Sequence, residues 1–169
     1  MIYQRDTNVN LNIRHLEQED FKEVAKIFSF KSVTENTSQN PFVNADIVAS
    51  LFESKNRYNL VALIDTEVVG YISLITSSKA RSKHCAAIAL AVHPDHHRKG
   101  VGRALLSEII NQADNWLNII RLELDVQADN SAAIKLYESL GFELEGVKRC
   151  ATFSQGRYFD LNFMSRIKS

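Results

Sequence analysis

The sequence predicts a single α+β domain in which one sheet is flanked by helices. Two patterns predict it: short β-rich runs, of which 58–64 and 68–76 are joined by a hairpin-length connection, and apolar residues at helical spacing, most clearly over 102–117. The 169 residues amount to one domain and suffice to bury a core. No repeat, low-complexity tract or linker divides the sequence, so we expect the domain to span residues 1–169.

The expected elements follow the order β-α-α-β-β-β-α-β-α-β-β. Asn44 can cap the second helix, Asp129 or Asn130 can cap the fourth, and Gly141 can end it. A polar loop is expected over 30–42. The strands are expected at 9–14, 58–64, 68–76, 86–92, 119–126, 142–153 and 157–167, and the helices at 17–28, 45–54, 102–117 and 129–140.

Composition narrows the classes of function. Lysine plus arginine and aspartate plus glutamate number 20 each, so neither nucleic-acid binding nor a polybasic membrane patch is expected. Cys85 and Cys150 are too few and too far apart for a disulfide framework or a zinc ribbon. The first residues lack the apolar core of a signal peptide, and no run approaches the roughly 20 apolar residues of a membrane span. We therefore expect a cytoplasmic protein.

The run 86–92 alternates so regularly that a strand would give it two unlike faces. One face would carry only alanine and the other only large aliphatic side chains. A closely packed helix over the small face explains the pattern, and so does a ligand that approaches the backbone; a bulge would scramble it. The small residues are Ala87, Ala89 and Ala91, and the large ones are Ile88, Leu90 and Val92.

The stretch after this strand, HPDHHRKGVGRALL over 93–106, predicts an anion site. A short loop with Gly100 and Gly102 leads into the longest helix. The first N–H groups of a helix have no intrahelical acceptor, and the peptide dipoles favour negative charge there. Arg98, Lys99 and Arg103 add positive charge around those groups. We therefore expect a phosphorylated ligand at this loop.

Two familiar phosphate-binding loops do not match this stretch. A P-loop has four residues between its glycines and then Lys-Ser/Thr, whereas one residue separates Gly100 from Gly102. A dinucleotide fold has G-x-G-x-x-G/A directly after its strand. Here Leu105 takes the third position and residues 94–99 intervene, although Glu123 falls near the spacing of the ribose-binding acid.

A third kind of loop matches better. His97 to Gly102 resembles the Q/R-x-x-G-x-G/A acyl-CoA loop of the GCN5-related N-acetyltransferases, with His97 in place of Gln or Arg. Residues 129–137, DNSAAIKLY, and Gly141-Phe142 resemble the family's D-N-x-x-A-x-x-L-Y…G-F motif. The element order fits nearly end to end and implies a mixed, mostly antiparallel twisted sheet. Similarity to bacterial L-amino-acid N-acetyltransferases and phosphinothricin-acetyltransferase-like proteins lies in 114–117, 121–124, 142–146 and 156–160, followed by Met164.

The resemblance implies that the protein binds acetyl-CoA, with no metal. The pyrophosphate would lie on N–H groups of 98–103, and the pantetheine arm would pair with 90–92, in a cleft where that strand diverges from 121–126. An N–H near Leu90 would stabilise the oxyanion. The implied cofactor-binding residues are Leu90, Ala91, Val92, His97, Arg98, Lys99, Gly100, Val101, Gly102, Arg103, Asn130, Ala133 and Tyr137.

Tyr137 is the catalytic residue that the resemblance implies, as general acid for the departing thiolate. A phenol with an ordinary pKa near 10 can protonate the thiolate of a thiol with a pKa near 8.5. A tyrosine that only packs in the core is the structural alternative. The general base stays open between Glu123, Asp125, His84 and a chain of water molecules.

Two further groups of side chains each have a structural and a functional interpretation. Lys148 and Arg149 form a solvated basic pair or receive the carboxylate of a substrate. Phe28, Phe30 and Phe42 belong to the core or line an acceptor pocket.

Three histidines near Pro94 do not predict a metal site. His93, His96 and His97 lie in a loop with no nearby cysteine, and Asp95 is the only carboxylate close to them in sequence.

The activity that the resemblance implies is acetyl transfer from acetyl-CoA to the amine of a small molecule, such as an L-amino acid, by direct attack in a ternary complex. The alternatives are a protein or peptide N-acetyltransferase and a non-catalytic acyl-CoA-binding module. The family's specificity usually resides in the part before residue 80, where the resemblance is less distinctive. A homodimer stays open.

Overall fold

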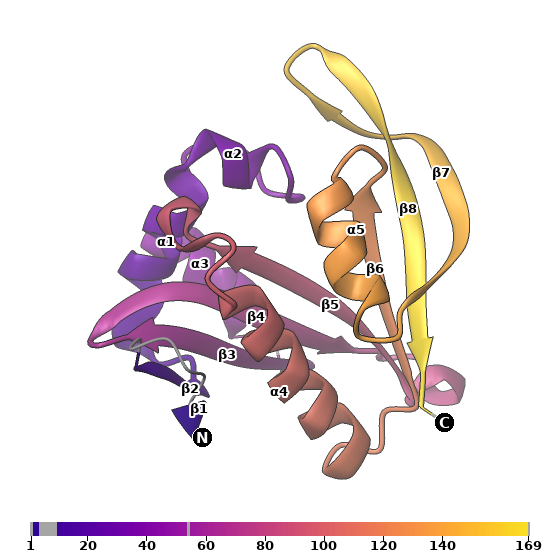
Figure 1. Cartoon of the computed structure of the whole chain (residues 1–169), viewed down its shortest axis with the longest axis horizontal. Helices are drawn as coiled ribbons and strands as arrows, with labels where there is room; N and C mark the ends of the chain where they lie inside the picture. Colours follow the sequence, from indigo (N-terminus) through magenta and orange to yellow (C-terminus); the bar gives the residue numbers. More distant parts are fainter. Residues whose placement is uncertain (1, 4–9, 54, 169) are drawn as a thin grey trace.

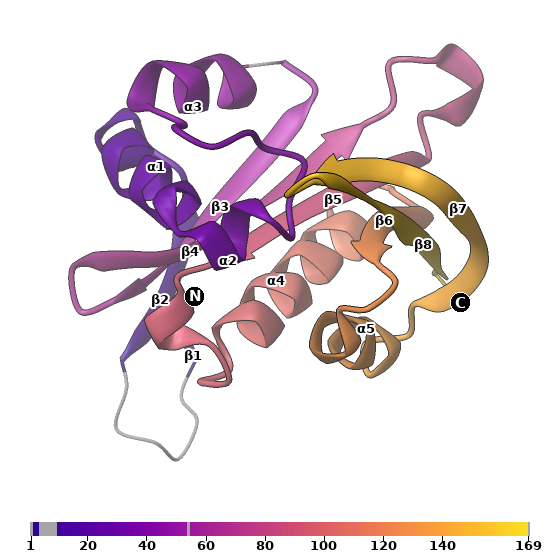
Figure 2. The ribbon, with the colours of Figure 1, turned by 90° about the horizontal axis from the view of Figure 1, so that it is seen from above.

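The computed structural model of the protein is a twisted sheet with helices on both faces (Figure 1, Figure 2). It describes residues 2–3, 10–53 and 55–168. The strands are β1 Ile2–Tyr3, β2 Leu11–His15, β3 Arg57–Ile64, β4 Glu67–Thr76, β5 Cys85–Val92, β6 Arg121–Gln127, β7 Glu143–Ser154 and β8 Arg157–Ile167. The helices are α1 Phe21–Ser29, α2 Lys31–Thr34, α3 Ala45–Phe52, α4 Val101–Asn115 and α5 Ser131–Glu138, with 3₁₀ turns η1 Gln18–Asp20, η2 Ala80–Ser82 and η3 Pro94–His96.

The strands lie in the order β1-β2-β3-β4-β5-β6-β8-β7. Within the described ranges β5 and β6 are the one parallel pair, and the other neighbours are antiparallel. Helices α1 and α3 cover one face, and α4 and α5 lie on the other (Figure 2). The predicted mixed, mostly antiparallel sheet is therefore confirmed. No helix in the part of the chain that the structure describes is long and apolar enough to cross a membrane.

The expected element order is present with two additions. One is the two-residue strand β1, and the other is α2, which lies inside the segment 30–42 that was expected to be a loop. Thr34 accounts for this turn of helix, because its Oγ1 donates to Phe28 O at 2.6 Å while Val33 is buried beside it. Val9 of the first expected strand and Ser54 of the second expected helix lie outside the described residues.

The helix ends follow the sequence signals. Asn44 caps α3 by accepting a hydrogen bond from Ile47 N at 2.9 Å. Asn130, rather than Asp129, caps α5. Gly141 follows α5 with a φ of +86°, a left-handed conformation that glycine adopts without a steric penalty and that ends the helix.

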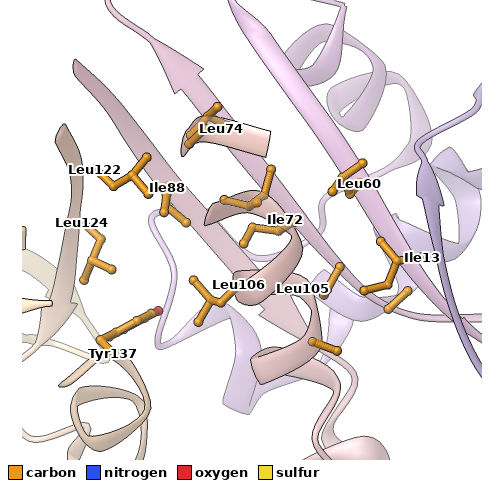
Figure 3. Close-up of a cluster of buried hydrophobic side chains, with 14 of the residues drawn as sticks. Ile13, Leu60, Ile72, Leu74, Ile88, Leu105, Leu106, Leu122, Leu124 and Tyr137 are labelled. Carbon is orange, nitrogen blue, oxygen red and sulfur yellow. The ribbon is translucent and has the colours of Figure 1, made fainter. Parts of the chain in front are cut away.

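The two faces of the sheet carry separate apolar cores. The core under α4 includes aliphatic side chains of β4 and β5, and Figure 3 shows Leu105 and Leu106 of α4 pointing into it, with Tyr137 at its edge. The second core packs α1 against the opposite face, where the rings of Phe28 and Tyr71 lie 5.3 Å apart. Together the two cores hold β4 and β5 in the centre of the sheet and so fix the position of β5.

Candidate functional site

Strands β5 and β6 diverge after their paired residues (Figure 1). A cavity of about 1930 Å³ lies between the residues of the two strands beyond this point. Residues 87–92 of β5 form one wall, and 123–127 of β6 form the opposite wall. The loop before α4, the start of α4 and part of α5 also line it. The cavity exceeds the roughly 300–1,000 Å³ of a typical small-molecule pocket, so it has room for two ligands. The strands β5 and β6 pair only before they diverge, at Cys85↔Arg121, Ala86↔Leu122 and Ala87↔Glu123.

The main chain of β5 presents hydrogen-bonding groups to this cavity. His93 N donates to Val69 O at 2.8 Å and Ser77 N donates to Cys85 O at 3.2 Å, so the odd-numbered residues of β5 bond to β4. The even-numbered residues therefore direct their N–H and C=O groups toward β6, which pairs with β5 only as far as Ala87. The main-chain N–H and C=O of Leu90 thus face the cavity, and this N–H is the one expected near the oxyanion.

The side chains of β5 keep the predicted alternation, because its pairing with β4 has no register shift. Ile88 lies in the core under α4, and Ala91 lies in the core under α1. Ala87 is exposed and Ala89 is half-buried, and both line the cavity. Each interpretation of the small face therefore holds for part of it: α1 packs over Ala91, and open space reaches the backbone at Ala87 and Ala89.

The loop before α4 has the geometry of an anion site. Gly100 has a φ of +86° and Arg98 a φ of +60°, and a Cβ at Gly100 would meet no atom within 4 Å. Among the described residues, the first N–H of α4 that bonds a main-chain acceptor is that of Ala104, on Gly100 O at 3.0 Å. The N–H groups of 98–103 thus face no competing main-chain acceptor, and the open space before them fits the diphosphate of CoA.

The side chains of this loop divide into two kinds. Arg98 and Lys99 are exposed, whereas Arg103 reaches α5, where its guanidinium donates to Ser139 Oγ at 2.6 Å. His97 folds back over the strand end, and its Nε2 donates to Val92 O at 2.9 Å. His97, which stands where the motif has Gln or Arg, therefore uses a main-chain carbonyl on the cavity side of β5 as its hydrogen-bond acceptor.

Tyr137 is both a core residue and a wall of the cavity. It is 9% exposed, its ring lies 5.8 Å from that of Phe142, and its hydroxyl points toward Leu106 (Figure 3). Burial raises the pKa of Tyr137 to about 12, so the hydroxyl stays protonated at neutral pH. A protonated phenol on a cavity wall can donate a proton but cannot serve as a base there.

Asn130 has two hydrogen bonds that the motif did not predict. Its Oδ1 accepts from Ala133 N at 3.2 Å and so caps α5, while its Nδ2 donates to Asn36 Oδ1 at 3.1 Å. Both Asn130 and Ala133 line the cavity. The side chain expected at the pantetheine arm therefore also ties α5 to the loop after α2.

The two carboxylates proposed as general base are both ion-paired. Glu123 accepts a hydrogen bond of 2.5 Å from Arg121 Nε, and the two other nitrogens of this guanidinium donate to Glu145. The hydrogen bonds from Arg121 and, to a smaller extent, from Ser165 lower the pKa of Glu145 to about 2. Asp125 accepts bonds of 2.7 and 2.8 Å from Lys148 Nζ. Lys148 is thus committed to Asp125, which counts against its expected role at a substrate carboxylate.

Several other candidates lie away from the cavity. His84 is exposed at the far end of β5, and Arg149 is exposed on β7; neither lines the cavity. Phe28 is fully buried against Tyr71, and Phe42 is 94% exposed. His84 and Arg149 therefore lie outside the cavity in which a base or a carboxylate receiver would act, and the burial of Phe28 favours its interpretation as a core residue.

Two of the three histidines near Pro94, His93 and His96, pack with Phe30. The rings of Phe30 and His93 lie 4.4 Å apart, and those of His93 and His96 lie 5.6 Å apart. Burial, together with Lys99 and His93, lowers the pKa of His96, so this imidazole is neutral at neutral pH. In the described parts of the chain, no group of three or more His, Cys, Asp or Glu side chains could hold a metal ion.

The other end of the cavity is lined by residues that the sequence did not single out. Arg57 and Tyr71 come from β3 and β4. Glu35 O accepts a hydrogen bond from Gln127 Nε2, so the loop after α2 bonds β6 as well as Asn130. No local motif marks these residues, because sheet pairing and long-range hydrogen bonds bring them together. Knowledge of the strand register would have been needed to find them.

Comparison with known proteins points to one family. Residues 12–142 match the profile of the Acetyltransferase (GNAT) family. L-amino acid N-acetyltransferase AaaT of Escherichia coli is 35% identical over 157 residues, which are 92% of this chain and 97% of that protein. The fold matches yncA, described as an acetyltransferase from Salmonella typhimurium with its cofactor acetyl-CoA, with a TM-score of 0.82, 26% identity and 93% coverage of each chain. It also matches a structure described as a phosphinothricin N-acetyltransferase, with a TM-score of 0.86, 24% identity and coverage of 95% and 99%, which concerns the fold alone.

Proposed function

This chain belongs to the GNAT acetyltransferase family and is an acetyl-CoA-dependent N-acetyltransferase, and we propose that its acceptor is the α-amine of a small L-amino acid. The observation that carries the proposal is one continuous cavity that runs from the anion loop at 98–103 to the alanine face of β5. Donor and acceptor can occupy its two ends together, as direct attack in a ternary complex requires. The similarity to an L-amino acid N-acetyltransferase over nearly the whole chain supports the choice of acceptor.

The donor end of the cavity is formed largely by main chain. The N–H groups of 98–103 would hold the pyrophosphate, and the exposed charges of Arg98 and Lys99 would add to their field. The cavity-facing main-chain groups of Leu90 and the N–H of Val92 would pair with the pantetheine arm, and Asn130 and Ala133 would border it from α5. These assignments need only the backbone positions of β5 and α4, which the two apolar cores hold.

When bound, acetyl-CoA supplies an acetyl thioester, and transfer exchanges its C–S bond for a C–N bond to the amine. Leu90 N–H would donate to the carbonyl oxygen as negative charge develops there, and one such donor is worth about 2.7–4 kcal/mol in a known enzyme. Tyr137 would give its hydroxyl proton to the sulfur, so that CoA leaves as a thiol. The phenol regains a proton from the nitrogen of the new amide, through water, which balances the transfer.

The amine must be neutral when it attacks, so an ammonium acceptor first loses a proton. We propose that this proton leaves through water at the Glu123 side of the cavity, since Glu123 lines the cavity although Arg121 holds one of its oxygens. Asp125 is a weaker candidate, because Lys148 bonds both of its oxygens.

The size of the acceptor end favours a small amine over a peptide. The loop after α2 bonds Gln127 and Asn130, which both line the cavity, and we propose that these bonds limit the room for a long acceptor chain. A peptide acceptor would have to break these two hydrogen bonds, whereas a free amino acid would not.

The experiment is a free-thiol assay with acetyl-CoA and a panel of L-amino acids, polyamines and histone-like peptides. Thiol release with amino acids and not with peptides is the expected result. Turnover of peptides alone would contradict the proposal. CoA binding with no turnover of any amine would instead favour a non-catalytic acyl-CoA-binding module.

A further inference from the structure

Arg57 is a cation at the acceptor end of the cavity without a carboxylate partner among the described residues. It begins β3, is half-buried and lines the cavity. The one side-chain hydrogen bond of Arg57 within the described chain goes from the guanidinium to Ser73 Oγ at 3.3 Å, a neutral and long contact. Arg14, Arg121 and Arg166, by contrast, each bond a carboxylate at 3.0 Å or less. Arg57 therefore keeps most of its guanidinium donors available to a ligand.

The opposite wall carries net negative charge. Glu123 and Glu145 share Arg121, so two carboxylates and one guanidinium leave one negative charge in excess. Asp125 and Lys148 next to them cancel each other. The two walls of the acceptor end therefore have opposite signs.

Strand register puts these two charges in one row across the sheet. Arg57 pairs with Ile75, Ile75 with Ala87, and Ala87 with Glu123. Directly opposite residues in paired strands point to the same face, so Arg57 and Glu123 lie on the face that carries the small alanines. Only Ile75 and the methyl group of Ala87 separate them in this row.

The gap between the two charges matches the length of an amino acid. The guanidinium lies over Ser73 on β4, and β4 and β6 are about 10 Å apart across two strand spacings. An amino acid that bonds a guanidinium through its carboxylate and a carboxylate through its ammonium spans about 9 Å, bonds included. A zwitterion would therefore bridge the row with its charges correctly matched.

We propose that Arg57 binds the α-carboxylate of the acceptor, while the cluster of Glu123, Arg121 and Glu145 attracts its ammonium group, so that the enzyme selects zwitterionic amino acids over amines without a carboxylate. The inference rests on the proposed function and assigns its specificity to residues that no motif marks. It replaces Lys148 and Arg149 as receivers of the carboxylate.

The experiment compares the proteinogenic L-amino acids with their α-amides, which keep the amine and the side chain but lack the negative charge. We expect the wild-type kcat/KM to favour an acid over its amide by about 100-fold. Arg57→Gln is expected to lower kcat/KM for acids by about 100-fold and to leave the amides within about threefold, because only the acids lose a charge-assisted bond. Glu123→Gln is expected to lower both by about tenfold, since both carry the ammonium group.

Arg81→Gln is the matched control, because Arg81 lies in the exposed turn η2 outside the cavity, and it should behave as wild type. The CoA dissociation constant and the melting temperature of each variant separate loss of recognition from loss of folding. Acids that react normally with Arg57→Gln would overturn the assignment of Arg57 alone. Amides that react as well as acids in the wild type would overturn selection for the carboxylate, and a panel in which no amino acid reacts would overturn the proposed function itself.

Discussion

The two ends of the cavity are built from different parts of the polypeptide. The donor end uses main-chain groups of β5 and of the loop before α4, whose conformation depends on Gly100 and on the start of a helix. The acceptor end uses side chains, such as Arg57 and Glu123, that come from strands distant in sequence. A main-chain site needs a short run of residues, whereas a side-chain site needs the register of the whole sheet.

This difference allows the two ends to change independently. Many side chains can surround an N–H cradle without altering the cradle itself. His97 illustrates this, because it bonds Val92 O at the position where the acyl-CoA loop motif has Gln or Arg. By contrast, a substitution of one charged residue at the acceptor end is expected to change which acceptor molecule binds. We therefore expect variants at the donor end to affect CoA whatever the acceptor, and variants at the acceptor end to affect one class of acceptor.

Tyr137→Phe should have the largest effect of the variants near the donor. Loss of the general acid is expected to lower kcat by about 100-fold for every acceptor, while the CoA dissociation constant stays within about twofold. Steady-state kinetics with two acceptors and calorimetric titration of CoA measure both quantities. Tyr58→Phe is the control, because Tyr58 bonds Gln112 away from the cavity. A full rate in Tyr137→Phe would leave this tyrosine with a packing role only.

Gly100→Ala should weaken CoA binding by about tenfold. An L-residue in the left-handed region costs about 1–2 kcal/mol, and the loop is expected to relax in a way that turns its N–H groups from the diphosphate. Calorimetric titration of CoA is the measurement. Gly146→Ala is the control, since a Cβ there meets no atom within 4 Å and its φ is not positive. Equal affinity in the two variants would argue against a main-chain cradle.

Asn36→Ala should raise the KM of the acceptor by a few-fold without changing CoA affinity. It removes the 3.1 Å bond to Asn130 Nδ2, a typical hydrogen bond of about 1 kcal/mol, and so loosens the loop over the acceptor end. Asn40→Ala in the same exposed loop is the control. A change in CoA affinity of the same size as the change in KM would contradict the separation of the two ends.

The smallest expected effect concerns the pH dependence of kcat, which should show no decrease at alkaline pH. Because the pKa of Tyr137 is raised to about 12, its hydroxyl keeps the proton that it donates up to well above neutral pH. We expect kcat to rise with pH as the amine loses its proton and then to stay level to about pH 10. A falling limb with a midpoint below about pH 10 in the wild type, lost in Tyr137→Phe, would contradict the raised pKa.

The sequence predicted most of the fold and the glycine-bearing loop before α4 at the proposed donor end, because both depend on local signals. The alternation in 86–92, the glycines before α4 and the cap Asn130 each act within a few residues of themselves. It did not predict α2, since the bond from Thr34 to Phe28 O is a tertiary detail of a polar segment. It left Lys148 open between a solvated basic pair and a receiver of the carboxylate, because the partner Asp125 comes within reach only through the pairing of β6 and β7 with β8. Arg57 was missed for the same reason.

Hydrogen–deuterium exchange with and without CoA tests the central claim most directly, namely that the carrier lies between β5 and β6 with its diphosphate on the loop after Pro94. In the free protein the amides of 98–103 and of Leu90 have no main-chain acceptor in the described chain, so they should exchange fast. CoA is expected to slow exchange at both segments and to leave the hairpin of β7 and β8 unchanged. Protection confined to other segments, with 98–103 and Leu90 as fast as before, would contradict the account.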